Sequence, residues 1–214
     1  PENRIALISL ALFSAQKGHA RPAAEFYDRF LAIDPGNAEV LSQRANLAET
    51  KKELDTAVRV RRQLAEVAPK NIQNLFHLGQ LLIDSDMDQD AAEIFLQLAR
   101  DYPELGQPYV QLGLIEIRKN RHADAVRMFR EGAKRMPDNP EIPTMIGFTS
   151  LAAKQDTDAL RAFKDALKLD SKNTNVLFTL GEVQHRLGDF GGAVGTFQTL
   201  LTVDPSHSDA LNYL

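Results

Sequence analysis

The sequence contains no cysteine among its 214 residues. This absence excludes disulfides, thiolate metal sites and cysteine nucleophiles together. It does not decide the compartment, because a cytoplasmic and a bacterial periplasmic or cell-envelope protein can both lack cysteine. Localisation therefore stays open.

Long apolar runs are also missing. The longest, such as residues 5–13, are far shorter than the roughly 20 residues that a bilayer-spanning helix needs, so we expect no direct membrane insertion. No signal peptide is visible. The first residues, Pro-Glu-Asn without an initiator methionine, suggest a piece of a longer chain.

Charge of one sign is not concentrated anywhere in the sequence. The 25 basic and 29 acidic residues leave a net charge of -4, which argues against binding to nucleic acid, because that binding needs a basic face. A hydrophobic content of 43% with 25% charged residues is typical of a folded, soluble protein.

Catalytic patterns are equally scarce. The segment FGGAV at residues 190–194 indicates a turn and a helix start and not a phosphate-binding loop, because no strand precedes it. The histidines form no helical metal-binding pair, and two of them fall on predicted groove helices. The five histidines are His19, His77, His122, His185 and His207. We predict no enzymatic activity, no cofactor and no metal.

One aspartate-rich stretch, DSDMDQDAAEIF at residues 84–95, resembles a calcium loop only in part. Aspartates stand at its first, third and fifth places. However, Gln89 replaces the glycine that turns an EF-hand loop, and Phe95 replaces its bidentate glutamate. Asp88 and Asp90 are predicted to lie near a helix N-terminus, where carboxylates are favourable.

The chain repeats itself with one fixed period, the spacing from Ala23 to Ala57, and no insertion or deletion interrupts it. Small residues, aromatic residues and prolines recur at fixed places in this repeat period. The alanines are Ala23, Ala57, Ala91, Ala125, Ala159 and Ala193; four residues later come Tyr27, Arg61, Phe95, Phe129, Phe163 and Phe197. Twelve residues before the alanines stand Ala11, Ala45, Gly79, Gly113, Gly147 and Gly181; twelve after them stand Pro35, Pro69, Pro103, Pro137, Ser171 and Pro205.

Each copy predicts two amphipathic helices separated by a turn and ended by a proline. We expect the glycine or alanine of the first helix to face the alanine of the second, so that the helices approach closely. The aromatic residue is expected to fill the wedge toward the neighbouring repeat. A single pair cannot bury its apolar face alone, so the copies must stack.

The pattern resembles the tetratricopeptide repeat over the whole chain, on residues such as Leu177, Leu180, Gly181, Ala193 and Phe197. The resemblance implies an all-α, right-handed α-solenoid. Its six repeats would cover residues 4–37, 38–71, 72–105, 106–139, 140–173 and 174–207, with residues 208–214 starting a further helix. Pro1 stands one repeat period before Pro35, and Leu214 stands one repeat period after Leu180. We therefore expect that the sequence is a piece of a longer repeat array, and that the cut ends of this piece could self-associate.

The resemblance also implies a concave face lined by the first helices, which takes a peptide or a partner's helix. First-helix residues outside the packing slots are the candidates for this groove. They are Phe76, Gln80, Val110, Leu114, Phe148, Phe178, Glu182 and His185. Two interpretations stay open: the large apolar side chains turn inward against the adjacent repeat, or they form an exposed stripe that marks an interaction site.

The second repeat departs from the pattern, because Arg44 and Arg61 occupy slots that are apolar in the other copies. We predict that their aliphatic stems cover apolar surface while the guanidinium groups reach solvent. A softer junction or a charged docking point is the alternative.

These observations favour a non-catalytic scaffold that binds a protein or peptide in its groove. Two other functions remain open. The chain could be the substrate-docking arm of an enzyme whose catalytic domain lies elsewhere, or a bacterial cell-envelope assembly or secretion factor.

Overall fold

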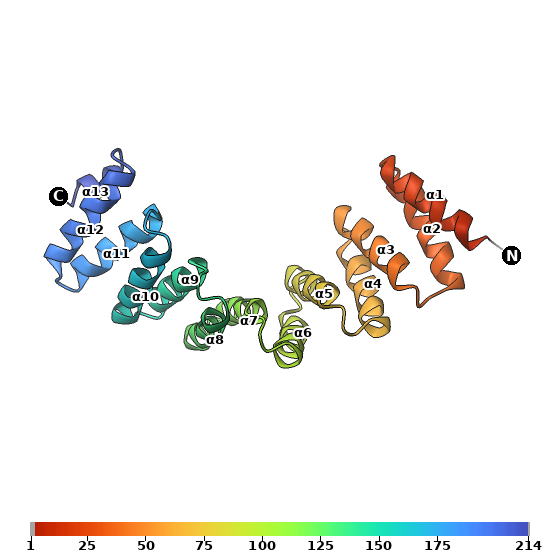
Figure 1. Ribbon diagram of the computed structural model, residues 1–214, viewed down its shortest axis with the longest axis horizontal. Coiled ribbons are helices and arrows are strands. Elements are labelled where there is room, and N and C mark those ends of the chain that lie inside the picture. Colours follow the sequence, from red (N-terminus) through yellow and green to blue (C-terminus); the bar gives the residue numbers. More distant parts are fainter. Residues whose placement is uncertain (1–2, 214) are drawn as a thin grey trace. The chain divides into compact units, whose positions relative to one another are not determined.

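The structure, a computed structural model, describes residues 3–213, which form helices and no strand (Figure 1). The first helices of the predicted repeats are α1 Arg4–Gln16, α3 Ala38–Thr50, α5 Ile72–Asp84, α7 Gln107–Arg118, α9 Glu141–Ala152 and α11 Thr174–Arg186. The second helices are α2 Ala20–Ile33, α4 Leu54–Val67, α6 Asp88–Asp101, α8 His122–Arg135, α10 Asp156–Leu169 and α12 Phe190–Val203. A short α13, Ser208–Leu211, follows.

The helices divide into two compact units, with the boundary between Leu98 and Ala99 inside α6. Within each unit, the extensively packed helix pairs of the described residues are all neighbours in sequence, such as α1 with α2 and α9 with α10. This pattern is that of a stack in which each repeat contacts the next one along the chain. The division of the chain into one domain of six repeats stays a prediction.

Most first helices begin with a capping side chain at a place that also recurs with the repeat period. The Oδ1 atoms of Asn37, Asn71 and Asn173 accept hydrogen bonds from backbone N–H groups three residues later, at 3.0 to 3.1 Å. His207 uses Nδ1 in the same way to start α13, at 3.3 Å. The caps satisfy N–H groups that have no partner inside the helix.

Replacing the cap Asn173 with alanine is expected to lower the free energy of unfolding by about 1 kcal/mol, because the N–H of Val176 loses its acceptor. Urea denaturation measures the change. Asn175→Ala, on an exposed residue of the same helix, is the control, and we expect it to stay within about 0.5 kcal/mol. An equal loss in both variants would contradict the capping role.

The turn between the two helices of a repeat uses one left-handed residue per copy. Positive φ angles recur with the repeat period, at Gly18, Lys52, Asp86, Asn120, Lys154 and Gly188. Glycine adopts this conformation without steric cost, which explains why two of the six places carry it.

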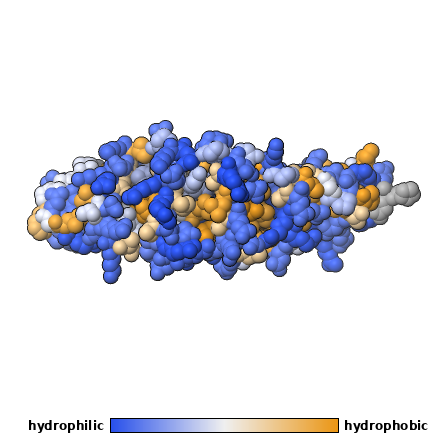
Figure 2. Space-filling model, turned by 90° about the horizontal axis from the view of Figure 1, so that it is seen from below, coloured by the Kyte–Doolittle hydropathy of each residue, from blue (hydrophilic) through white to orange (hydrophobic). Residues whose placement is uncertain are grey.

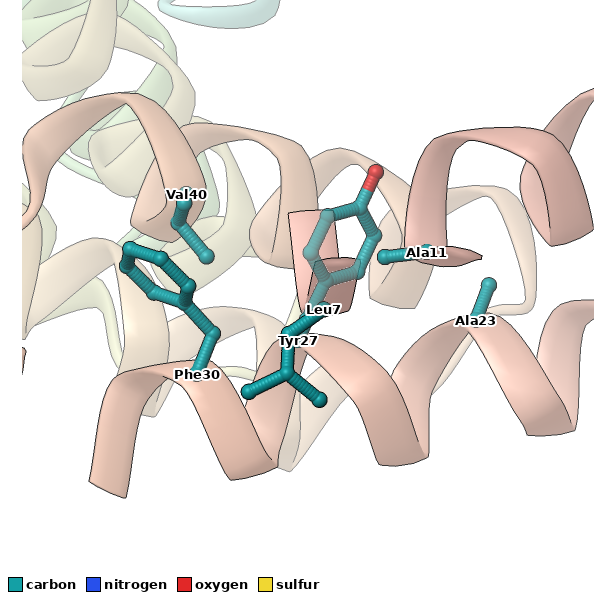
Figure 3. Close-up of a cluster of buried hydrophobic side chains, with 6 residues drawn as sticks. All are labelled: Leu7, Ala11, Ala23, Tyr27, Phe30 and Val40. Atoms are coloured by element: carbon teal, nitrogen blue, oxygen red, sulfur yellow. The ribbon is translucent and has the colours of Figure 1, made fainter. Parts of the chain in front are cut away.

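The core of each repeat gathers side chains from its own two helices and the next first helix. Figure 3 shows this for the first repeat, where Leu7 and Ala11 of α1, Tyr27 and Phe30 of α2 and Val40 of α3 point toward one another. All five are buried. By contrast Leu10, whose counterparts in the other repeats are buried, is 45% exposed, because no second helix precedes α1 among the described residues to cover it.

The aromatic residue of the second helix packs both against the next repeat and within its own. As expected, it fills the space toward the neighbouring repeat: Phe163 belongs to one core cluster with Val176 and Leu180 of α11. Its ring also covers the glycine of its own repeat. A Cβ atom added to Gly79 would lie 2.5 Å from Cζ of Phe95, and one added to Gly181 would lie 2.6 Å from Cε1 of Phe197. The missing side chain therefore makes room for the ring, a contact that the repeat pattern did not predict.

The fold class is confirmed as an all-α solenoid of helix-turn-helix repeats. Of the residues on which a further helix was predicted, 208–211 form α13, whereas Leu214 lies outside the described residues. Pro1, on which we based a preceding repeat, also lies outside them.

Candidate functional site

The second unit carries most of the predicted groove residues on three first helices. Val110 and Leu114 lie on α7, Phe148 lies on α9, and Phe178, Glu182 and His185 lie on α11. We call the surface that these six residues form the first-helix face of the second unit. They are one or two repeat periods apart, or three or four residues apart within a helix, which places them on corresponding sides of their helices.

Two apolar side chains of the first-helix face are open to solvent. Leu114 is 37% exposed and Phe148 is 42% exposed. The ring of Phe148 rests edge-on against the buried ring of Phe163, with a centroid distance of 5.1 Å and an interplanar angle of 73°. Its outer part remains uncovered. Apolar residues of this kind appear among polar ones on the surface in Figure 2.

The other apolar groove residues are partly buried. Phe178 lies 5.9 Å from the core ring of Phe197, centroid to centroid, and Phe76 in the first unit lies 5.8 Å from Phe95 in the same way. Val110 lines a cavity of about 180 Å³ between α7 and α9, together with Met145. The first-helix face thus combines exposed apolar side chains with a small recess.

Aromatic rings gather at the C-terminal end of the same face. Phe178 stacks on His207 at a centroid distance of 5.0 Å, and Tyr213 stacks on Phe197 at 4.5 Å. His185 is exposed, and its ring lies 5.5 Å from that of Tyr213. The segment after α12 thus covers part of the α11 surface that the sequence marked as groove.

The first unit has both apolar and polar side chains at the corresponding places, because Leu12 is 41% exposed and Phe76 is partly buried beside polar residues. Gln80 is exposed and donates a hydrogen bond to Asp84 at 3.3 Å. Together with Glu49 and His77 these residues line a cavity of about 430 Å³ between α3 and α5. Nδ1 of His77 lies 3.3 Å from Oε2 of Glu49.

The prediction for the two arginines of the second repeat was wrong. The side chain of Arg61 is only 4% exposed and that of Arg44 only 7%, so their guanidinium groups do not reach solvent. Arg61 binds Glu49 at 2.6 Å, Asn46 at 2.6 Å and Asn74 at 3.2 Å. These partners satisfy the buried charge, because a carboxylate and two amide oxygens replace water around it.

Arg44 is held by carboxylates on either side of its helix. Its Nε atom donates to Asp28 Oδ1 at 2.8 Å, and its Nη1 atom lies 3.8 Å from Glu53 Oε2. Sequence reasoning missed these partners. A signal existed for Arg61: Glu49 stands at a place that is Ala15, Ile83, Ile117 and Leu151 in four other copies.

Side chains that could ligate a metal do not cluster within residues 3–213. No group of three or more histidine, cysteine, aspartate or glutamate side chains there could hold a metal ion. In the aspartate-rich stretch, Asp84 ends α5, while Asp88 and Asp90 occupy the first turn of α6. No helix of the described chain is long and apolar enough to cross a membrane.

Comparisons with known proteins agree with this geometry. Tetratricopeptide repeat family models match residues 73–104 and 150–213. No curated protein matches the sequence. Among solved structures, a MamA protein superposes with a TM-score of 0.69 at 18% identity, over 80% of this chain and 94% of that one.

Two further structures are similar. YrrB, a TPR protein with an unusual peptide-binding site, has a TM-score of 0.67 at 17% identity, over 89% of this chain and 98% of that one. PilF of Pseudomonas aeruginosa has a TM-score of 0.64 at 20% identity, over 98% of this chain and 96% of that one. The chain thus carries tetratricopeptide repeats at residues 73–104 and 150–213 and shares the fold of these structures.

Proposed function

We propose that this protein is a non-catalytic scaffold that binds a peptide, or an extended or helical segment of a partner protein, on the first-helix face of the second unit. The observation that carries the proposal is the exposure of Leu114 and Phe148, at corresponding places of α7 and α9. Phe163 already fills the core behind Phe148. The core therefore does not require a second aromatic ring at position 148. Contiguous exposed apolar surface typically marks an interaction site.

The comparisons support the proposal in a general way. The tetratricopeptide repeat fold is generally a non-catalytic interaction scaffold, and the similar protein YrrB has a peptide-binding site. The docking-arm and cell-envelope functions stay predictions.

The chemistry of the face indicates the kind of segment that fits. Leu114, Phe148 and the partly exposed Phe178 offer apolar contacts, while Glu182 and His185 on α11 offer polar ones. Full burial of such a side chain contributes about 1.5 to 3 kcal/mol, and covering only the part that is still exposed would contribute less than this for each residue. Association and ordering remove several kcal/mol of this gain, so we expect affinities of about micromolar strength at best.

The test uses peptides selected from a random phage-displayed library against the intact chain. Leu114→Ala and Phe148→Ala should each weaken binding of a selected peptide about 10-fold, which corresponds to about 1.4 kcal/mol. Val194→Ala is the matched control, because Val194 is 38% exposed but lies on the second helix α12. Unchanged affinity in both first-helix variants, measured by calorimetry, would rule out this face.

A further inference from the structure

A second concave feature of the second unit is lined by none of the six residues of the first-helix face. It is a cavity of about 490 Å³ lined by residues of α8, α9 and α10 and of the loop between α8 and α9. Its walls are apolar, with Ala133, Met136, Ile146, Ala162 and Leu169 among them. A volume of this size is typical of sites that hold a ligand or a large side chain.

The rim of this cavity has more cations than carboxylates: Arg130, Lys134 and Arg161 stand against Asp158 and Asp165, and Asp165 already binds Lys168 at 2.6 Å. Arg130 and Arg161 share the carboxylate of Asp158, at 4.0 Å and 3.7 Å, which are too long for hydrogen bonds. One carboxylate cannot balance two guanidinium groups. Both arginine side chains are more than half exposed, so an incoming anion could reach them.

Lys134 adds a third cation to the rim. It binds Glu131 at 2.5 Å, and the same carboxylate accepts a hydrogen bond from Arg135 at 3.0 Å. Hydrogen bonds from Lys134 and then from Arg135 lower the pKa of Glu131 below its ordinary value, so this carboxylate stays charged. Here too, two cations share one carboxylate.

The repeat symmetry supplies an internal comparison. The first unit has a cavity of about 480 Å³ at the places that lie two repeat periods earlier, between α4 and α6. There Glu66 and Glu93 stand where the second unit has Lys134 and Arg161. A cavity of this size is therefore a regular product of repeat packing, whereas the basic rim is particular to the second unit.

We propose that the cavity between α8 and α10 is a second docking site, which takes an acidic segment of a partner protein. An apolar side chain of the segment would enter the cavity, and carboxylates on either side of it would meet Arg130, Lys134 and Arg161. Charge complementarity selects this occupant. Opposite charges at a rim raise specificity and association rate, while the apolar cavity retains the segment.

The experiment compares two synthetic peptides with the same apolar centre, Asp-Glu-Leu-Phe-Glu-Asp and Lys-Arg-Leu-Phe-Arg-Lys. They are titrated into the intact chain by calorimetry at low ionic strength, where surface charges are least screened. We expect the acidic peptide to bind and the basic one to bind at least about 10-fold more weakly. Equal affinity for both peptides, or no binding of the acidic one, overturns the proposal.

The decisive variant transplants the charges of the first unit into the second, as Lys134→Glu with Arg161→Glu. This variant should bind the acidic peptide at least about 10-fold more weakly than the native chain does. The matched control, Arg127→Glu with Lys164→Glu, makes the same change of charge on α8 and α10 outside the cavity, and circular dichroism checks that both variants are folded. An equal loss in the two variants would indicate general attraction to a basic surface and would overturn the proposal.

Two further variants separate the cavity from the first-helix face. Leu169 lies on the cavity wall and is 44% exposed, so it can be changed to serine without disturbing the core. Leu169→Ser should also weaken binding of the acidic peptide. Leu114→Ala with Phe148→Ala should leave its affinity unchanged. If that last pair weakens the acidic peptide and the charge transplant does not, the peptide occupies the first-helix face, so the second site is absent while the proposed function stands.

Discussion

Gly147→Ala is expected to lower the free energy of unfolding by about 1 to 3 kcal/mol, although it adds a single methyl group to a helix. The added Cβ would lie 2.6 Å from Cδ1 of Phe163 and closer still to Cε1. The buried ring cannot retreat without displacing its neighbours in the core. Urea denaturation monitored by circular dichroism measures the loss.

The control for this prediction is the same substitution at Gly195, on the exposed side of α12. No atom lies within 4 Å of a Cβ placed there, so Gly195→Ala should instead raise stability by about 0.5 to 1 kcal/mol through reduced freedom of the unfolded chain. Combining Gly147→Ala with Phe163→Leu tests the contact directly, because the smaller side chain should remove part of the clash. If both glycine substitutions stabilise the chain, the ring does not require the glycine.

Glu49→Ala is expected to lower the free energy of unfolding by about 3 to 5 kcal/mol, because it leaves the guanidinium of Arg61 buried without a countercharge. The control is Glu53→Ala. Glu53 lies 3.8 Å from Arg44, and its side chain is 51% exposed, so its loss should cost at most about 1 kcal/mol. Similar losses in the two variants would contradict the importance of the buried network.

The same network should be replaceable as a whole. The residues found at these places in other repeats give the combined variant Ala45→Gly, Glu49→Ile, Arg61→Phe and Asn74→Val. The free energy of unfolding of this variant should lie between that of the native chain and a value about 4 kcal/mol higher. The reason is that well-packed apolar side chains are often as stabilising as a buried ion pair, or more so. A loss as large as that of Glu49→Ala would show that the repeat cannot accept the common packing.

The repeat period was sufficient to predict the helix pairs, because each copy repeats the same apolar places at helical spacing. Ala23, Gly79 and Phe129 identify packing positions whether or not their partners are known. The contact that the sequence did not reveal is the one between Phe95 and Gly79, because spacing along the chain does not say toward which neighbour a ring turns. The sequence signal for this contact is that the repeats with phenylalanine on the second helix have glycine on the first, whereas the repeat with Tyr27 has Ala11 there.

The candidate site was less predictable than the fold. The positions on the first helices could be named, but the exposure of Phe148 and the partial burial of Phe178 depend on rings contributed by other segments, including Tyr213. The buried setting of Arg61 depends on Glu49 and Asn74, which come from two other helices. Side-chain partners of this kind follow from packing between elements, which a single sequence does not specify.

Thiol footprinting tests the central claim most directly, because the chain has no cysteine of its own. Single substitutions Leu114→Cys and Val194→Cys place a thiol at two positions of nearly equal exposure, 37% and 38%, on a first and a second helix. A saturating selected peptide should slow modification of the thiol at position 114 and leave that at position 194 unchanged. Protection at position 194 alone, or at neither position, would contradict binding on the first-helix face.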